Sequence, residues 1–196
     1  MAVVQHTLFI SANRLKKDTA IGGSVDENLM FPYILLAQEM QILPILGTDL
    51  YNALITKINA NTLTGDYKTL LEDYIQKALV HFSFAELAVF MRLRFVNNAV
   101  VIMGSTDQST SATYEDLKPL IDKANNAGQF FRERTIDYLN DKGSATFPEF
   151  SSNTDAGDLS PTSSNYFAGI NLDINNYKSQ RARSILRQSG FTIYDC

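Results

Sequence analysis

Residues 31–54 read F-P-Y-I-L-L-A-Q-E-M-Q-I-L-P-I-L-G-T-D-L-Y-N-A-L, and this stretch predicts the fold. Its apolar residues recur at intervals of three and four, which is the spacing of a buried helix face. Gly47 interrupts the pattern and Thr48, a residue that favours helix starts, follows it, so we expect two helices joined by a tight corner. Pro32 lies inside the first helix, where we expect a kink or a restart.

The same helical spacing continues on both sides of this stretch. We expect a short helix capped by Ser11, and a capping box over Ser24–Glu27 that opens the helix containing Pro32. A long helix from about residue 66 to residue 103 is apolar nearly all round and should therefore be central. A last helix should start at Thr113 and end near Gly143. The predicted fold class is mainly α, a bundle of about four helices.

The composition changes after residue 142. Between residues 151 and 165 only Ala156 and Leu159 fall outside the set Ser, Thr, Asn, Asp, Gly and Pro. Such a tract buries too little apolar surface to offset the entropy of ordering it. We therefore expect a helical domain over residues 1–142 and a long, mostly extended C-terminal arm over residues 143–196, with short strands at 166–174 and 191–194.

The arm carries aromatic and basic side chains at intervals, which is typical of a segment that adds to a neighbour's sheet or lies in its grooves. We expect neighbouring subunits to order it. The candidate partner-contact residues are Phe147, Phe150, Tyr166, Phe167, Lys178, Arg181, Arg183, Arg187, Phe191 and Tyr194. The basic members could touch DNA phosphates or an acidic protein surface, and the acidic chain as a whole favours the protein partner.

Composition limits the classes of function. The 196 residues include 17 basic and 21 acidic side chains, a formal net charge of −4, which weakens the case for a free-standing nucleic-acid binder. The single cysteine, Cys196, excludes an internal disulfide framework and a cysteine-based zinc site. The most apolar stretch, residues 78–91, is shorter than the roughly 20 residues of a membrane span, so we expect a buried helix and no membrane partner. No targeting segment is expected.

Motifs for catalysis are missing from the sequence, which contains no phosphate-binding loop, nucleophile elbow or zinc-protease helix. His81 is interpreted as a core histidine, and Glu86 as half of a structural ion pair with Arg92, Arg94 or Arg132. Glu133 and Asp137, four positions apart, could hold a metal, but a solvated helix face is favoured. We therefore predict no enzyme, no catalytic residue, no cofactor and no metal.

The opening stretch also resembles tailed-phage head–tail connector (adaptor) proteins, and it is most similar to connectors of crAss-like phages. The resemblance extends over about residues 8–142 and is a packing pattern. In it, Gly47 would serve the corner and Gln38 would hydrogen-bond a backbone group there. The matching residues are Ala37, Gln38, Ile42, Leu46, Gly47, Leu50, Tyr51 and Leu54.

The resemblance implies a virion structural protein. Its copies, expected to number twelve, would form a homo-oligomeric ring below the portal protein, with neighbouring neck or tail ring proteins as further partners. Double-stranded DNA would pass through the ring without its sequence being read. The implied location is the portal vertex or neck of the virion, after assembly in the host cytoplasm.

Two other functions stay open at the level of the sequence. One is a packaging, scaffold-binding or DNA-contacting helical adaptor that does not remain in the ring. The other is a small helical enzyme that uses Glu86, His81, or Glu133 with Asp137. The enzyme would need these groups to converge on one pocket.

Overall fold

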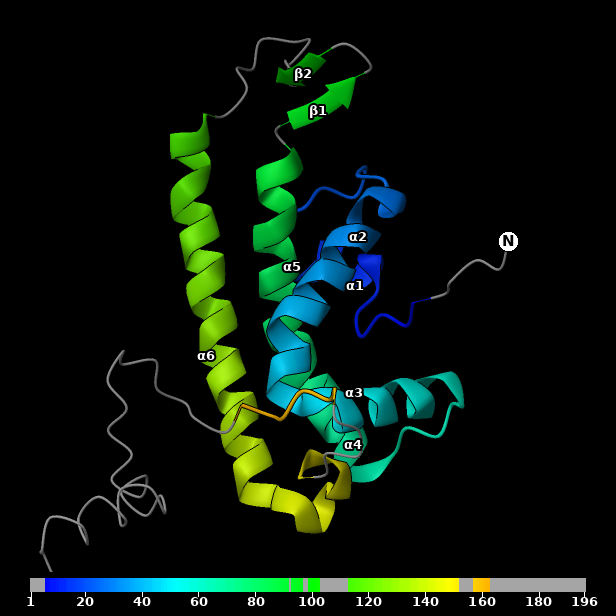
Figure 1. Cartoon of the computed structure of the whole chain (residues 1–196). Coiled ribbons are helices and arrows are strands. Elements are labelled where there is room, and N and C mark those ends of the chain that lie inside the picture. Colours follow the sequence, from blue (N-terminus) through cyan, green and yellow to red (C-terminus); the bar gives the residue numbers. More distant parts are fainter. Residues whose placement is uncertain (1–5, 92, 97–98, 103–112, 152–156, 163–196) are drawn as a thin grey trace, which may run out of the picture. The chain divides into compact units, whose positions relative to one another are not determined.

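Helices make up most of the chain that the computed structural model describes, which is residues 6–91, 93–96, 99–102, 113–151 and 157–162 (Figure 1). The prediction of a mainly α bundle of about four helices is confirmed. The elements in chain order are α1 (Ala12–Asp18), α2 (Glu27–Ala37), a π-helical turn η1 (Gln38–Ile42), α3 (Leu43–Asn59), α4 (Gly65–Thr69), a second π-helical turn η2 (Leu70–Ile75), α5 (Gln76–Met91), strands β1 (Leu93–Val96) and β2 (Ala99–Ile102), α6 (Tyr114–Thr146) and a 3₁₀ turn η3 (Pro148–Phe150).

Helix α5 is central, as its all-round apolar composition predicted. It packs against α6 on one side and against α2 on the other, an arrangement visible in Figure 1. The contact with α6 is close at Gly128, where a Cβ atom would lie 2.8 Å from the ring of Phe82 on α5. A glycine on α6 therefore makes room for an aromatic side chain on α5.

Side-chain caps set the starts of the helices. The Ser11 hydroxyl accepts a hydrogen bond from the backbone N–H of Arg14, and Thr113 forms a capping box with Asp116, so both predicted starts are confirmed. The predicted Ser24–Glu27 capping box is wrong. Asp26 caps α2 instead, because it directly precedes the first helical residue and its carboxylate accepts from the N–H of Asn28 at 2.9 Å.

The break in the first long helical run falls at Gly47 and not at Pro32. Helix α2 runs through Pro32, so the helix does not restart there; the missing N–H of proline removes one helical hydrogen bond. The π-helical turn η1 precedes Pro44, and in it Leu43 donates to the carbonyl of Gln38, five residues back. Gly47 has φ 75° and ψ 164°, which only glycine adopts readily, and it forms the predicted corner.

The helix expected to reach residue 103 ends at Met91. Residues 93–96 and 99–102 form two antiparallel strands, with Leu93 paired to Ile102 and Val96 to Ala99. The prediction failed because a short apolar run fits helix and strand equally well by periodicity. The valines of this run and the two asparagines between its halves are the residues that favour a hairpin.

Described residues beyond position 142 also pack on the helices: Phe147 is part of the core, and Leu159 and Thr162 hydrogen-bond to residues of α3. Helix α6 bends at Gly143 (φ 59°, ψ −168°), near the predicted end, and the following residues pack back on the helices. Residues 166–196 and the strands predicted within them lie outside the described residues.

Residues 157–162, which we call the corner strap, cover Gly47. The N–H of Thr48 donates to the carbonyl of Leu159 at 3.1 Å, and the N–H of Leu159 donates to the Thr48 hydroxyl at 2.9 Å. The N–H of Thr162 donates to the carbonyl of Pro44 at 2.9 Å. A Cβ atom at position 47 would lie 2.9 Å from the Leu159 carbonyl oxygen, so the strap needs glycine there.

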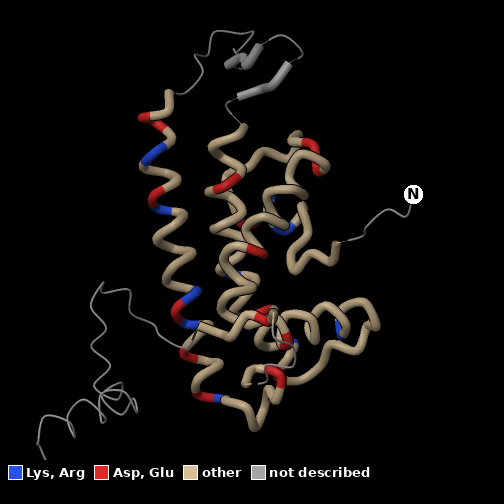
Figure 2. The backbone as a smooth tube through the Cα atoms, in the orientation of Figure 1, with Lys and Arg blue, Asp and Glu red and all other residues tan. Residues whose placement is uncertain are grey.

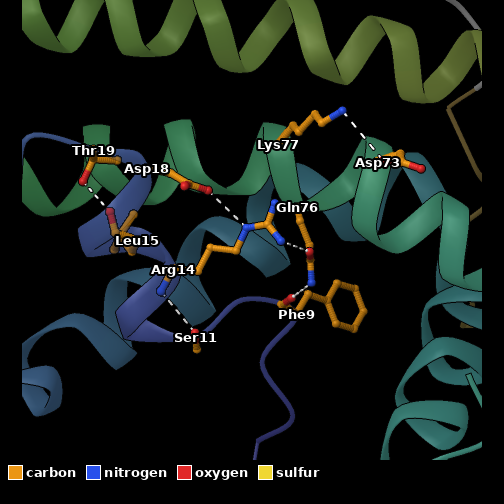
Figure 3. Close-up of polar contacts among 9 residues, drawn as sticks. All are labelled: Phe9, Ser11, Arg14, Leu15, Asp18, Thr19, Asp73, Gln76 and Lys77. Carbon is orange, nitrogen blue, oxygen red and sulfur yellow. Dashed lines mark hydrogen bonds and ion pairs between the residues drawn. The ribbon is translucent and has the colours of Figure 1, made fainter.

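Two side-chain amides hold the segment that precedes α1. Gln38 is fully buried; its Oε1 accepts from the N–H of Phe9 at 2.8 Å, and its Nε2 donates to the carbonyl of Thr7 at 3.0 Å and to the Tyr51 hydroxyl at 2.7 Å. Gln76 donates to the carbonyl of Phe9 at 2.7 Å (Figure 3). The predicted backbone bond of Gln38 is therefore present, but it holds the N-terminal segment and not the Gly47 corner.

We expect Gly47→Ala to destabilise the fold more than Gly143→Ala. Both glycines have backbone angles that disfavour alanine, which costs about 1–3 kcal/mol, but a Cβ atom at position 143 meets nothing within 4 Å. The additional contact with the strap should cost position 47 roughly 1 kcal/mol more. Urea unfolding measures the free energy of unfolding of both variants. Equal losses of stability would show that the strap does not crowd a Cβ atom at position 47.

We expect Gln38→Leu to lower the free energy of unfolding by about 2–4 kcal/mol, because it leaves buried backbone and hydroxyl groups without partners. Gln76→Leu is the matched control: it breaks the bond to the same residue, Phe9, and the bond that Gln76 accepts from Arg14 at 2.7 Å, both from a half-buried side chain that water can replace. The Gln76 variant should lose about 1 kcal/mol of unfolding free energy. A Gln38 variant no less stable than the Gln76 variant would contradict this account.

Candidate interaction surface

The side chains considered for catalysis stay in separate places. His81 on α5 is half-buried and stacks on Phe131, with ring centroids 5.7 Å apart and an interplanar angle of 4°. Burial lowers its pKa, against a smaller opposing effect of Asp18. These contacts fit the interpretation of a core histidine. Within the described ranges, no group of three or more His, Cys, Asp and Glu side chains is placed to hold a metal.

The candidate carboxylates are equally dispersed. Glu86 is half-buried on α5, whereas Glu133 and Asp137 are exposed on α6. The suggested pairing of Glu86 with Arg132 is not among the ion pairs of the described side chains. The Nε of Arg132 is buried there without a hydrogen-bond partner. The side chains of Arg92 and Arg94 lie outside the described residues.

The first two partner-contact candidates of the arm belong to the chain's own core. Phe147 is 0% exposed and packs edge-on against Tyr67, with ring centroids 5.1 Å apart, so its predicted contact with a partner is wrong. Phe150 is half-buried against the same core. The prediction missed these core contacts because it relied on the average polar composition of the arm. Isolated aromatic residues at the start of a polar tract can still complete an existing core. The other eight candidates, Tyr166, Phe167, Lys178, Arg181, Arg183, Arg187, Phe191 and Tyr194, lie outside the described residues.

The start of the arm is held by the partly buried phenol of Tyr67. Tyr67 on α4 donates its hydroxyl to Glu149 Oε2 at 2.6 Å, and the ammonium group of Lys57 lies 4.3 Å from the centre of its ring. Desolvation, followed by the hydrogen bond and the charge of Glu149, raises the pKa of Tyr67 to about 12. The neutral phenol is therefore the form that holds η3 in place.

Helix α2 and the turn that follows it carry several exposed apolar side chains. Leu29 is 47% exposed and Met40 in the following turn is 55% exposed. Pro32 and Leu36 lie between them and are also exposed. We call this set the α2 stripe: Leu29, Pro32, Leu36 and Met40. Large apolar side chains grouped on one exposed face mark interaction surfaces more often than isolated ones do.

An apolar groove of about 530 Å³ adjoins the α2 stripe at Pro32. Its lining residues come from α2 and from the N-terminal segment, and none of them is Asp, Glu, Lys or Arg. They are His6, Leu8, Asn28, Phe31, Pro32 and Leu35. The stripe and the groove can bind apolar side chains. Their residues do not bring together the acid, base and nucleophile that a catalytic site combines.

Periodicity could not show which face of α2 is exposed. The structure buries Met30, Ile34 and Ala37 and leaves Leu29 exposed, although all four are apolar. One feature of the sequence indicated an exposed apolar face on α2. Like the central α5, this helix is apolar on all faces, although fewer elements surround it.

The run from Glu27 to Asn59 is long and apolar enough to cross a membrane by length and composition alone, and 39% of the tested window is buried. Core helices pass the same test. Here Gly47 breaks the run with a φ of 75°, and the buried side of α2 packs on α5.

The fold and the surface define a helical bundle with an exposed apolar face and no assembled catalytic cluster among its described residues. The chain belongs to the family of unknown function DUF6712, whose match covers residues 42–158, more than half of its length. The match begins after α2 and ends in the corner strap. Searches of curated proteins and of solved structures gave no match.

The raised pKa of Tyr67 predicts a loss of stability at alkaline pH. The unfolded phenol ionises near pH 10 and the folded one near pH 12, so the bond is fully stabilising below pH 10 and its contribution falls as pH rises to 12. Tyr67→Phe should flatten this part of the curve of unfolding free energy against pH. Burial also raises the pKa values of Tyr51 and Tyr138. These two tyrosines contribute equally to the alkaline loss of stability in the unaltered protein and in Tyr67→Phe.

Glu149→Gln separates the two causes. Without the carboxylate charge, the pH at which stability falls should move down towards 10, because only burial still disfavours the phenolate. Urea unfolding at several pH values between 8 and 12 measures both variants. An alkaline slope unchanged in Tyr67→Phe would refute the assignment.

Proposed function

We propose that this protein is a virion structural subunit of the head–tail connector (adaptor) class, which forms a ring below the portal through which DNA passes. The observation that carries the proposal is the α2 stripe, an apolar face that is exposed among the described residues. A subunit that covers this face by assembly removes it from water, which is the main driving force of association.

The residues of the resemblance support a packing role. Leu46, Leu50 and Leu54 are fully buried at and after the Gly47 corner. Gln38 and Tyr51 are joined by a buried hydrogen bond of 2.7 Å. All of them position helices, and none is presented to a small molecule, which is what a structural subunit requires.

Charge is compatible with a passage for DNA. An acidic wall repels phosphates, so a chain with a net charge of −4 lets a duplex slide without binding it tightly. The basic residues between Lys178 and Arg187 are left to contact the portal or a neighbouring ring in this proposal.

Electron microscopy of the purified full-length protein tests the proposal. Closed rings are expected, of twelve copies by the resemblance, and the same ring should occupy the neck of virus particles. Because the interface is largely apolar, the rings should persist from low to high salt. A protein absent from the particle neck would refute the proposal.

The alternative of a DNA-contacting packaging adaptor makes the opposite prediction. It should bind duplex DNA in a filter-binding assay, with an affinity that falls steeply as salt rises. Such binding without ring formation would replace the connector proposal.

A further inference from the structure

The corner strap contributes little to the apolar core. In Figure 1 it is the orange segment beside the start of α3. None of its residues is buried, and Leu159 is 50% exposed. Phe147, which precedes the strap, is by contrast fully buried. Apolar burial therefore does not explain why the strap is held at the corner.

Backbone groups of the corner hold the strap in place. In an uninterrupted helix the N–H of Thr48 would bond to the carbonyl of Pro44, four residues earlier. The backbone angles of Gly47 break this bond, and the strap takes both places. Thr48 donates to the carbonyl of Leu159 at 3.1 Å, and Pro44 accepts from the N–H of Thr162 at 2.9 Å. The interrupted helix is therefore a site for an extended segment of main chain.

The ring of Pro161 makes this fit close. A Cβ atom at position 47 would lie 2.9 Å from Cγ and from Cδ of Pro161. Proline restricts its own backbone and that of the residue before it to few conformations, which favours an extended chain. The strap therefore loses less conformational entropy when it docks on the corner.

The hydrogen bonds of the strap join uncharged groups. The third of them runs from the N–H of Leu159 to the Thr48 hydroxyl at 2.9 Å. Asp158 is the one charged residue of the strap, whereas acidic and basic residues follow one another along α6 in Figure 2. Salt screens charges and not neutral hydrogen bonds, so we expect the strap to stay in place at high ionic strength.

The strap also sets the free length of the arm. The next partner-contact candidate, Tyr166, follows Thr162 by four positions and Ser151, at the end of η3, by 15 positions. At about 3.5 Å per residue, the docked strap keeps Tyr166 within roughly 14 Å of Thr162. Released from the corner, the same residue could move roughly 50 Å from Ser151.

We propose that the corner strap is a clamp that fixes the root of the C-terminal arm at the Gly47 corner, so that the arm contacts a neighbouring copy of the chain close to that corner. This inference rests on the proposed assembly role and says where the contact of the arm forms. The bundles of a ring already touch, so the arm binds at an effective concentration that falls roughly as the −3/2 power of its free length. A free length of 15 residues instead of four should therefore weaken assembly about sevenfold.

Two insertions of equal length test the clamp in the full-length chain. Eleven Gly and Ser residues inserted after Asn165 bring the free length from four to 15 residues while the strap stays docked. The same insert after Asn153 lengthens only the chain before the strap and is the matched control. Sedimentation velocity over a range of concentrations should show about sevenfold weaker assembly for the first insertion and unchanged assembly for the second.

Gly47→Ala releases the strap by substitution. Hydrogen exchange at the Thr162 amide should become faster, and assembly should weaken about sevenfold, as with the insert after Asn165. In this variant the insert after Asn153 belongs to the free length and should weaken assembly about twofold more. Gly143→Ala is the control, because it also places alanine at a positive φ but leaves the strap docked, so it should assemble normally.

The insertions decide the inference even if Gly47→Ala does not fold. Equal effects of the two inserts, no effect of either, or a larger effect of the control would overturn the clamp. A folded Gly47→Ala chain that assembles normally although its Thr162 amide exchanges rapidly would also overturn it.

The results separate the clamp from the proposed function. Rings in the virion neck that form equally well from both insertion variants would overturn the clamp and leave the connector proposal standing. Weaker assembly of the Asn165 insertion alone, in a protein absent from the neck, would support the clamp and overturn the connector proposal. An unaltered protein that is monomeric at every concentration would overturn the clamp, because its arm then makes no contact between copies.

Discussion

The buried amide of Gln38 is the contact on which the rest of the described structure depends. It joins three segments, because it accepts from Phe9, donates to Thr7 and donates to Tyr51 on α3. A buried amide that loses such partners costs about 1–3 kcal/mol for each unsatisfied group, so the rotation of this helical run about its axis has one strongly preferred value. That rotation turns Met30 and Ile34 inward and leaves Leu29 outside.

The helical run that contains α2 and η1 therefore buries a polar side chain and exposes apolar ones. Gln38 is completely buried, whereas Leu29, Leu36 and Met40 remain exposed. A buried polar residue and a large exposed apolar face are the two departures from average burial that carry information about function. Here the first explains the packing of one chain, and the second marks the candidate interaction surface on α2.

Local signals in the sequence were sufficient for the helix ends that depend on a single side chain or a single glycine. Ser11 and Thr113 cap helices as predicted, and Gly47 forms the corner. Errors arose where two local patterns competed. Asp26 replaced Ser24 as the cap because it lies next to the helix, and residues 93–96 and 99–102 pair as strands although their apolar spacing also fitted a helix.

By itself, the sequence determined the helical class, the central position of α5 and the corner at Gly47, because each follows from periodicity or backbone sterics within a few residues. Only the tertiary structure decided which face of α2 is exposed, that Phe147 completes the core, and that residues 157–162 cover the corner. These features depend on groups far apart in the chain: Phe147 packs on Tyr67, and Leu159 bonds to Thr48. Periodicity reports that a residue is apolar, but the elements that surround it determine whether it is buried.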